Sequence, residues 1–272
     1  MTKTFIKMHG LGNDFAIFDG RQEKIQLTAE KIRDLADRRT GIGFDQVVII
    51  DPPKSSETDV FLRIYNADGG EVGACGNASR CVAKLLIAEL NKPEVTLETV
   101  AARLTAKMTG EKVVVDMDKV HLEWREIPLS RKEKTTFLPI FEDGFSEPVA
   151  VNVGNPHAVF FVEDVSKVAL ETFGPKIEHH ILFPERTNVE VAQVLSPTKI
   201  RMRVWERGAG ITQACGTGAC AVAVAGVRRG LTQRKATIIL DGGTLDIEWR
   251  ESDSHVLMTG DAEEVYRGKV EV

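Results

Sequence analysis

A sequence motif that occurs twice constrains this chain more than any other feature. The first copy starts at Arg63 and reads RIYNADGGEVGACGN; the second starts at Arg203 and reads RVWERGAGITQACGT. An arginine, an aliphatic residue, an aromatic residue, a glycine and the triplet Ala-Cys-Gly coincide at a shift of 140 residues. Self-similarity over so long a distance indicates that two parts of the chain share one fold. The sequence therefore predicts a tandem duplication.

A long apolar run follows each motif. Residues 78–90 after the first motif and 219–227 after the second leave little polar face. A helix that is apolar around its circumference is a buried helix, and both runs are too short to cross a membrane. Cys75 and Cys215 are therefore expected at the starts of two central helices. Because a helix N-terminus binds carboxylates and lowers the pKa of a thiol, each cysteine should mark an anion site with a reactive thiol.

Other polar positions repeat in the same order. At shifts of 142, 142 and 140 residues, the aligned pairs are Asn13 with Asn155, Gln46 with Asn188, and Asn66 with Glu206. Closely spaced short apolar runs around them predict strands that pair mostly antiparallel. We expect an α+β fold with two pseudo-symmetric lobes, each a mostly antiparallel β shell around a central buried helix. The predicted lobes are residues 1–118, completed by residues 264–272, and residues 119–263.

Two further helical segments are predicted. Thr28 caps a helix that reaches about Arg38, with Ile32 and Leu35 on its inner face. A second helical stretch begins at Ser166, and Gly174-Pro175 is expected to interrupt it.

Composition narrows the functional classes. The 272 residues carry a net charge of −5 with acids and bases interspersed, which argues against a nucleic-acid-binding surface. There is no apolar run of membrane-spanning length and no signal peptide, so a cytoplasmic chain with reduced thiols and no membrane partner is expected. The two cysteine pairs, at spacings of six and five residues, do not fit zinc ligands, and neither a metal nor a disulfide within a pair is expected.

Two thiols in equivalent places suit a reaction that is itself nearly symmetric. A nucleophilic cysteine would need only one thiol and a base, usually histidine. Inversion of a carbon centre uses two groups, because a thiolate removes the proton from one face and a thiol delivers a proton to the other. Cys75 and Cys215 are the candidates for this acid and base.

The remaining polar residues fit a small zwitterion. A lone asparagine is more often a turn former. Four asparagines, however, lie at positions that are paired between the two halves of the chain, and together they are interpreted as ligand contacts. They are Asn13, Asn66, Asn155 and Asn188. Arg207 could hold a second carboxylate in a bidentate manner. Glu206 could take an ammonium group, or form a surface ion pair. His157 could tune a nearby thiol, or be structural.

At these residues the chain resembles the diaminopimelate epimerases. The matching stretches run from end to end of the chain and are individually specific. They start at Lys7 (KMHGLGNDF), Gly41 (GIGFDQ), Tyr65 (YNADGGE), Cys75 (CGN), Gly154 (GNPH), Pro184 (PERTN) and Glu206 (ERGAGITQACGTG). One departure is Ala78-Ser79, where the family usually has Gly-Ala; it lies in the first helical turn and touches no catalytic position.

The resemblance implies a two-base epimerase without a cofactor or metal. It would interconvert LL- and meso-2,6-diaminopimelate for lysine and peptidoglycan synthesis, with Cys75 and Cys215 on opposite faces of the α-carbon. The resemblance also implies two pseudo-symmetric lobes with the substrate in the cleft, and a homodimer. The implied substrate contacts are the amides of Gly76, Asn77, Gly216 and Thr217 for the reacting carboxylate, and Asn13, Gln46, Asn66, Asn155, Asn188, Glu206 and Arg207 for the rest. His157 and Glu206 would adjust the thiols.

Two alternatives stay open at this point. The same fold also carries proline or hydroxyproline racemases and isomerases related to phenazine biosynthesis, although the full asparagine set with Glu206 and Arg207 favours a longer, diacidic and diamino substrate. A thiol-based redox or metal-binding module is a different class, and it leaves the asparagines unexplained.

Overall fold

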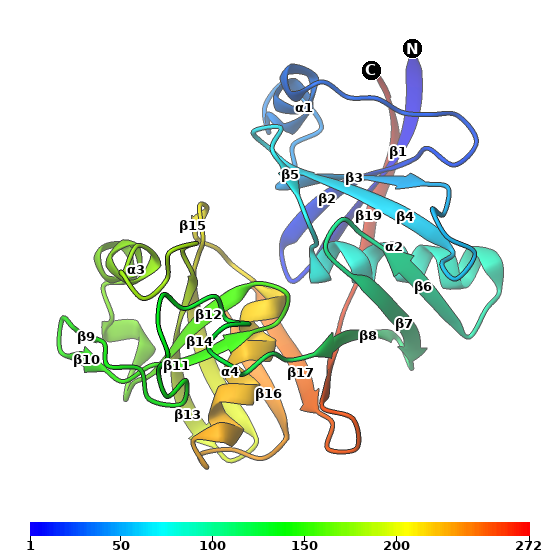
Figure 1. Ribbon diagram of the computed structural model, residues 1–272. Coiled ribbons are helices and arrows are strands. Elements are labelled where there is room, and N and C mark those ends of the chain that lie inside the picture. Colours follow the sequence, from blue (N-terminus) through cyan, green and yellow to red (C-terminus); the bar gives the residue numbers. More distant parts are fainter. The chain divides into compact units, whose positions relative to one another are not determined.

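The structure is a computed structural model that describes residues 1–272. The chain forms two compact units (Figure 1). The first unit comprises Met1–Val115 and Gly260–Val272, and the second unit comprises Asp116–Thr259. The repeat predicts lobe boundaries between residues 118 and 119 and between residues 263 and 264. These boundaries of the duplication stay a prediction.

Strands dominate the first unit. Its C-terminal strand returns to the start of the chain, because β19 pairs antiparallel with β1 from Thr2 opposite Glu271 to His9 opposite Glu263. Strand β8 (Lys112–Lys119) begins in the first unit and ends in the second, because the chain divides between Val115 and Asp116. The other elements are β1 (Thr2–Gly10), β2 (Asn13–Asp19), α1 (Ala29–Ala36), β3 (Gln46–Asp51), β4 (Val60–Asn66), β5 (Glu71–Val72), α2 (Gly76–Leu90), β6 (Glu94–Glu98), β7 (Arg103–Thr109) and β19 (Glu263–Glu271).

The second unit is also rich in strands. Its elements are β9 (Phe141–Glu142), β10 (Phe145–Ser146), β11 (Val149–Asn152), β12 (Pro156–Phe161), a 3-10 turn η1 (Val165–Lys167), α3 (Leu170–Glu178), β13 (Asn188–Ser196), β14 (Lys199–Glu206), β15 (Gly210–Ile211), α4 (Gly216–Arg228), β16 (Lys235–Leu240), β17 (Gly243–Trp249) and β18 (His255–Gly260). None of the helices in either unit is long and apolar enough to span a membrane.

Each unit contains the same order of strand pairings. In the first unit β2 lies parallel to β3, β3 antiparallel to β4, and β4 parallel to β6. In the second unit β12 lies parallel to β13, β13 antiparallel to β14, and β14 parallel to β16. Parallel neighbours need a crossover, which α1 and α2 provide in one unit and α3 and α4 in the other. Most of the other strand pairs are antiparallel, in agreement with the prediction of a mostly antiparallel shell. The positions of the parallel pairs were not predicted.

The two central helices are buried as predicted. Every residue of α4 from Gly218 to Gly226 is buried, and strands β11 to β14, β16 and β17 contact the helix. Residues Gly76–Ala83 of α2 are likewise buried, and β1, β2, β6 and β7 contact that helix. An apolar helix of this kind is stable only when other elements cover its whole circumference. The α+β class with a helix inside strands is confirmed in both units.

The helix expected after Thr28 is confirmed. The Thr28 side chain accepts a hydrogen bond from the Lys31 backbone N–H at 3.1 Å, which satisfies one of the free N–H groups of the first turn. The helix ends at Ala36, two residues before the predicted end.

The interruption expected at Gly174-Pro175 is wrong. Helix α3 runs through both residues to Glu178. Gly174 serves close packing instead, because a Cβ added there would stand 2.5 Å from Cγ of Trp205. A proline inside a helix removes one backbone hydrogen bond, and the packing of Phe173 and Ile177 into the core offsets this loss.

We predict that Gly174→Ala destabilises the protein by about 1–3 kcal/mol, because an added methyl group would overlap the buried part of the Trp205 ring. Urea unfolding measures this difference. Glu171→Ala, an exposed change in the first turn of the same helix, should stay within about 0.5 kcal/mol of the parent. Equal stability of Gly174→Ala and the parent would contradict the packing explanation.

Candidate active site

Cys75 lies at the start of the central helix of the first unit. It is the N-cap of α2, with φ −146° and ψ 113°, so its side chain stands at the end toward which the first N–H groups of the helix point. Its Sγ lies 3.8 Å from Oδ1 of Asn13, and the same oxygen accepts a hydrogen bond from Nδ2 of Asn77 at 3.2 Å. The fold therefore brings three of the predicted residues together at one helix end.

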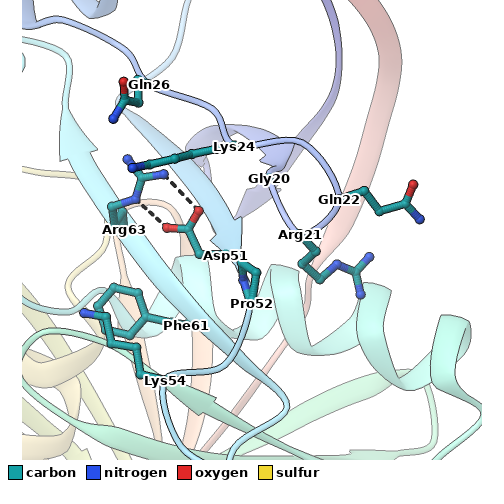
Figure 2. Close-up of a pocket in the computed structure, with 10 residues that line it drawn as sticks. All are labelled: Gly20, Arg21, Gln22, Lys24, Gln26, Asp51, Pro52, Lys54, Phe61 and Arg63. Atoms are coloured by element: carbon teal, nitrogen blue, oxygen red, sulfur yellow. Dashed lines mark hydrogen bonds and ion pairs between the residues drawn. The ribbon is translucent and has the colours of Figure 1, made fainter.

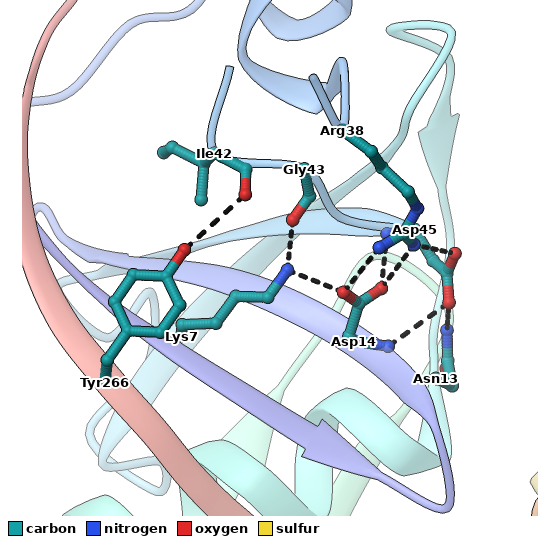
Figure 3. Close-up of polar contacts among 8 residues, drawn as sticks. All are labelled: Lys7, Asn13, Asp14, Arg38, Ile42, Gly43, Asp45 and Tyr266. Carbon is teal, nitrogen blue, oxygen red and sulfur yellow. Dashed lines mark hydrogen bonds and ion pairs between the residues drawn. The ribbon is translucent and has the colours of Figure 1, made fainter. Parts of the chain in front are cut away.

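A charged network holds Asn13 in place (Figure 3). Nδ2 of Asn13 donates to Asp45 Oδ2 at 3.0 Å. Arg38 donates to both Asp45 and Asp14 at 2.8 Å, and the Lys7 ammonium donates to Asp14 at 2.6 Å. Burial would raise the pKa of Asp14, but hydrogen bonds from Arg38 and Lys7 outweigh it and lower this pKa to about 2. Asp14, Arg38 and Asp45 were not among the site residues predicted from the sequence.

The first turn of α2 has its own support. Arg80 is fully buried, and its guanidinium donates to Oδ1 of Asn77 at 2.9 Å and to the Asp261 carbonyl oxygen at 3.3 Å. Ser79, the residue that departs from the family pattern, donates its hydroxyl to the Cys75 carbonyl oxygen at 2.9 Å. This bond to the preceding turn is a common arrangement for a helical serine, and it leaves the Asn77 amide bonded to Asn13 and Arg80.

Gln46 and Asn66 face each other on neighbouring strands. They are opposite partners in the antiparallel register of β3 and β4, and Nε2 of Gln46 donates to Oδ1 of Asn66 at 2.9 Å. Oε1 of Gln46 is buried without a hydrogen-bond partner in the protein. A buried, unpaired amide oxygen is expensive, so this oxygen is a ready acceptor for a donor on a ligand.

Cys215 occupies the same position in the second unit. It is the N-cap of α4, and its Sγ accepts a hydrogen bond from the Gly218 N–H at 3.4 Å. The hydroxyl of Thr217 lies 3.5 Å from the same sulfur. The residue is only 5% exposed.

The sequence-based expectation of a lowered thiol pKa is wrong for Cys215. Burial raises its pKa well above the ordinary value, and the nearby carboxylates of Glu206 and Glu190 raise it further. Hydrogen bonds from Thr217 and Gly218 act in the opposite direction but are weaker. Charge on a thiolate is disfavoured both by low dielectric and by neighbouring negative charge, and here these effects exceed that of the helix N-terminus.

Glu206 lies beside the thiol at the end of β14. Burial raises its pKa, while hydrogen bonds with Thr212 and Cys215 oppose the increase. The hydroxyl of Thr212 donates to Glu206 Oε1. Glu206 therefore faces the Cys215 thiol, which fits the predicted role of a group that adjusts it.

His157 lies fully buried between two polar groups. Its Nδ1 is 2.7 Å from Oε1 of Glu190, which is also fully buried, and its Nε2 is 2.8 Å from Oδ1 of Asn155. Glu190 was absent from the sequence-based site. The available signal was a single acidic residue flanked by Val189 and Val191 in a predicted strand.

Asn188 and Arg207 are joined to this cluster through the backbone. Nδ2 of Asn188 donates to the Pro156 carbonyl oxygen at 2.9 Å, and its Oδ1 accepts from the Arg207 backbone N–H at 2.9 Å. The exposed Arg207 guanidinium donates to the Glu185 carbonyl oxygen at 3.0 Å. This acceptor is neutral, so the positive charge of Arg207 is available to an acidic ligand.

Comparison with known proteins agrees with this arrangement. The family model described as diaminopimelate epimerase matches residues 5–123 and 149–265. The chain belongs to the diaminopimelate epimerase family. A protein of Rhodospirillum centenum named diaminopimelate epimerase is 51% identical over 271 residues, covering 99% of this chain and 93% of that protein.

Solved structures of low sequence identity share the fold of this diaminopimelate epimerase family member. A phenazine biosynthesis protein of the PhzF family from Bacillus anthracis has a TM-score of 0.69 at 16% identity, covering 100% of both chains. A probable proline racemase from Agrobacterium radiobacter K84 has a TM-score of 0.69 at 18% identity, covering 99% of this chain and 93% of that one. These likenesses concern the fold alone.

The larger of the two described pockets does not coincide with the predicted residues. It has a volume of about 580 Å³ and lies in the first unit (Figure 2). Its lining residues are Gly20, Arg21, Gln22, Lys24, Gln26, Asp51, Pro52, Lys54, Phe61 and Arg63. Arg63 donates to Asp51 at 2.9 Å, and the Lys54 ammonium lies 3.2 Å from the Phe61 ring centroid. None of the residues predicted for the site lines this pocket, so we assign it no part in the chemistry.

We predict that Asp14→Asn lowers the free energy of unfolding by about 2 kcal/mol at pH 7. The folded-state pKa of Asp14 is lowered to about 2, so its stabilisation is complete above its unfolded pKa of 3.8. This stabilisation disappears as the pH falls through about 2. Urea unfolding at pH 7, 4 and 2.5 should therefore show the gap between parent and variant narrowing at the lowest pH.

Asp34→Asn, an exposed change on α1, is the matched control and should stay within about 0.5 kcal/mol of the parent at pH 7. A gap for Asp14→Asn that is independent of pH would show that the ion pairs do not cause the stabilisation.

Proposed function

We propose that this isomerase epimerises diaminopimelate, converting the LL form to the meso form by a two-base reaction. One observation carries the proposal: in each unit a cysteine caps the N-terminus of the central buried helix, at Cys75 and at Cys215. The family membership and the names of the curated relatives support this choice of substrate over proline or hydroxyproline. Redox and metal-binding roles for the cysteines have no comparable support.

The two helix N-termini suit the reacting carboxylate of the substrate. Gly76 and Asn77 open α2, and Gly216 and Thr217 open α4. The backbone N–H groups of the first turn of a helix point out of its N-terminal end. Together with the positive end of the helix dipole they form a site for an anion. Binding of the carboxylate there also favours the reaction, because negative charge moves onto it when the α-proton leaves.

Each thiol has one part in the proton transfer. One cysteine, as thiolate, takes the α-proton and becomes a thiol. The other, as thiol, delivers its proton to the opposite face of the α-carbon and becomes a thiolate. The enzyme therefore carries the same number of protons before and after a turnover, with the roles of Cys75 and Cys215 exchanged, and the reverse reaction uses them in the opposite order.

The remaining predicted residues would bind the rest of the substrate. Asn13, Gln46, Asn66, Asn155, Asn188 and Glu206 already hydrogen bond to neighbouring groups, so each is held in a defined orientation for a ligand. The exposed Arg207 guanidinium suits the distal carboxylate, since it can donate two parallel hydrogen bonds. His157 and Glu206 would adjust the thiol at their end of the site.

The wider assignment follows from the same proposal. The reaction would serve lysine and peptidoglycan synthesis in the cytoplasm, with no cofactor, because the two thiols supply both the base and the acid. A homodimer is the proposed assembly. Exclusion of water around the thiols would favour the removal of a proton from so weak a carbon acid.

We predict that the protein exchanges the α-proton of LL-diaminopimelate with solvent and forms the meso isomer without pyridoxal phosphate. Proton NMR in D₂O follows the loss of the α-proton signal and the appearance of the meso isomer. Exchange with proline or hydroxyproline and none with diaminopimelate would replace the proposed substrate.

Cys75→Ala and Cys215→Ala should each abolish epimerisation, since each removes one of the two proton carriers. Cys81→Ala is the matched control, because Cys81 is a fully buried thiol of α2 away from the helix start. Wild-type turnover by either of the first two variants would contradict the two-base mechanism.

A further inference from the structure

The second unit contains a buried polar pair, His157 and Glu190. The mechanism above gives a role to His157 but none to Glu190. The side chains of His157 and Glu190 are both 0% exposed, and they face each other at 2.7 Å. Oε2 of Glu190 is buried and has no hydrogen-bond partner in the protein. Placing such groups away from water is unfavourable, and well-packed apolar residues of similar volume often give equal or greater stability.

The first unit shows that the fold does not require this pair. At the shift of 142 residues, Phe15 and Val48 stand where the second unit has His157 and Glu190. The strand registers agree, because Phe15 is the parallel partner of Gln46 and His157 is the parallel partner of Asn188. Phe15 and Val48 are both fully buried. The same backbone arrangement therefore accepts two apolar side chains at these positions.

Glu190 lies next to the start of α4. A Cβ added at Gly218 would stand 2.8 Å from Oε1 of Glu190 and 3.3 Å from Sγ of Cys215. The carboxylate and the thiol thus lie against the same glycine, whose N–H donates to the sulfur. A side chain at this position would displace the Glu190 carboxylate.

The imidazole of His157 is held from both sides. Nδ1 faces the Glu190 carboxylate, and Nε2 faces Oδ1 of Asn155, which is one of the proposed substrate contacts. Each ring nitrogen has a polar partner within hydrogen-bond distance, so a rotated or flipped ring would lose at least one of these contacts. Glu190 therefore connects the ring to the thiol end of α4, and Asn155 connects it to the substrate.

We propose that Glu190 is a positioning residue for the Cys215 half of the reaction: it orients His157 and, with it, controls proton transfer at the Cys215 thiol. The proposal rests on the proposed epimerase function. It explains why a buried acid and a buried histidine stand in one repeat where the other repeat has a phenylalanine and a valine.

Electrostatics supports the proposal. The groups that face the Cys215 sulfur are Glu206 from β14, Glu190 from β13, and Thr217 with the Gly218 N–H from α4. Burial is the largest cause of the raised thiol pKa, and the carboxylates of Glu206 and Glu190 add to it. Removing the charge of Glu190 while keeping its shape should therefore lower the pKa of the Cys215 thiol.

Glu190→Gln tests the proposal. We expect kcat for diaminopimelate to fall about 100-fold or more, the size of a general acid–base contribution, with a much smaller change in KM. In the free enzyme, the pH midpoint of Cys215 alkylation by iodoacetamide, followed by mass spectrometry of the Cys215 peptide, should move to lower pH. Glu163→Gln, an exposed change in the same unit, controls for the loss of one negative charge and should leave both readouts unchanged.

Unchanged kcat and an unchanged alkylation midpoint in Glu190→Gln would overturn the proposal. The alkylation measurement needs no substrate, so it separates the two proposals. If wild-type enzyme fails to act on diaminopimelate but the midpoint still moves, the proposed substrate is wrong while the link between Glu190 and Cys215 stands.

A double variant, His157→Phe with Glu190→Val, tests whether the pair is there for function. It copies the residues of the first unit, so we expect the melting temperature to be equal to or above that of the wild type and epimerisation to be lost. A large fall in melting temperature, together with near-normal activity of Glu190→Gln, would show that the pair serves the fold instead.

Discussion

The central helix of each unit is apolar around its circumference, and the remainder of the structure follows from this constraint. Such a helix must be covered on all sides, and strands β11 to β14, β16 and β17 do this for α4. Covering the sides leaves the N-terminus as the end whose N–H groups need another partner. Cys75 and Cys215 occupy these ends as N-caps. The shell that buries each helix therefore also leaves a helix N-terminus, a feature suited to binding an anion, with a thiol beside it.

The surroundings of the two thiols differ in chemical character. Side-chain amide groups of Asn13 and Asn77 lie next to Cys75, whereas the carboxyl groups of Glu206 and Glu190 lie near Cys215. The helix N-terminus favours negative charge on a thiol, but carboxylates and burial oppose it. The repeated fold thus supplies two equivalent positions, and side chains from the surrounding strands give each position its own electrostatics. A buried acid such as Glu190 often contributes no more stability than an apolar residue of similar volume, and the positioning role proposed for it accounts for its presence in the second unit alone.

Much of the fold and of the candidate site could be predicted from residue patterns. The continuous apolar runs indicated the buried helices, Thr28 indicated an N-cap, and the paired polar positions indicated the candidate site residues. The continuation of α3 through Gly174-Pro175 could not be predicted, because it depends on contact with Trp205, which is distant in the sequence. The supporting groups Asp45 and Glu190 were missed for a similar reason: each acts through a neighbour on another segment.

The sequence by itself determined which residues repeat, which segments must be buried and which cysteines start the central helices. These properties depend on periodicity, capping and self-similarity, which act over short stretches or are visible by alignment of the chain with itself. Only the tertiary structure decided the protonation preference of Cys215, the partner of His157 and the parallel pairing of strands within each unit. Each of these depends on which distant groups come within a few ångströms of one another, and on how far burial removes water from between them.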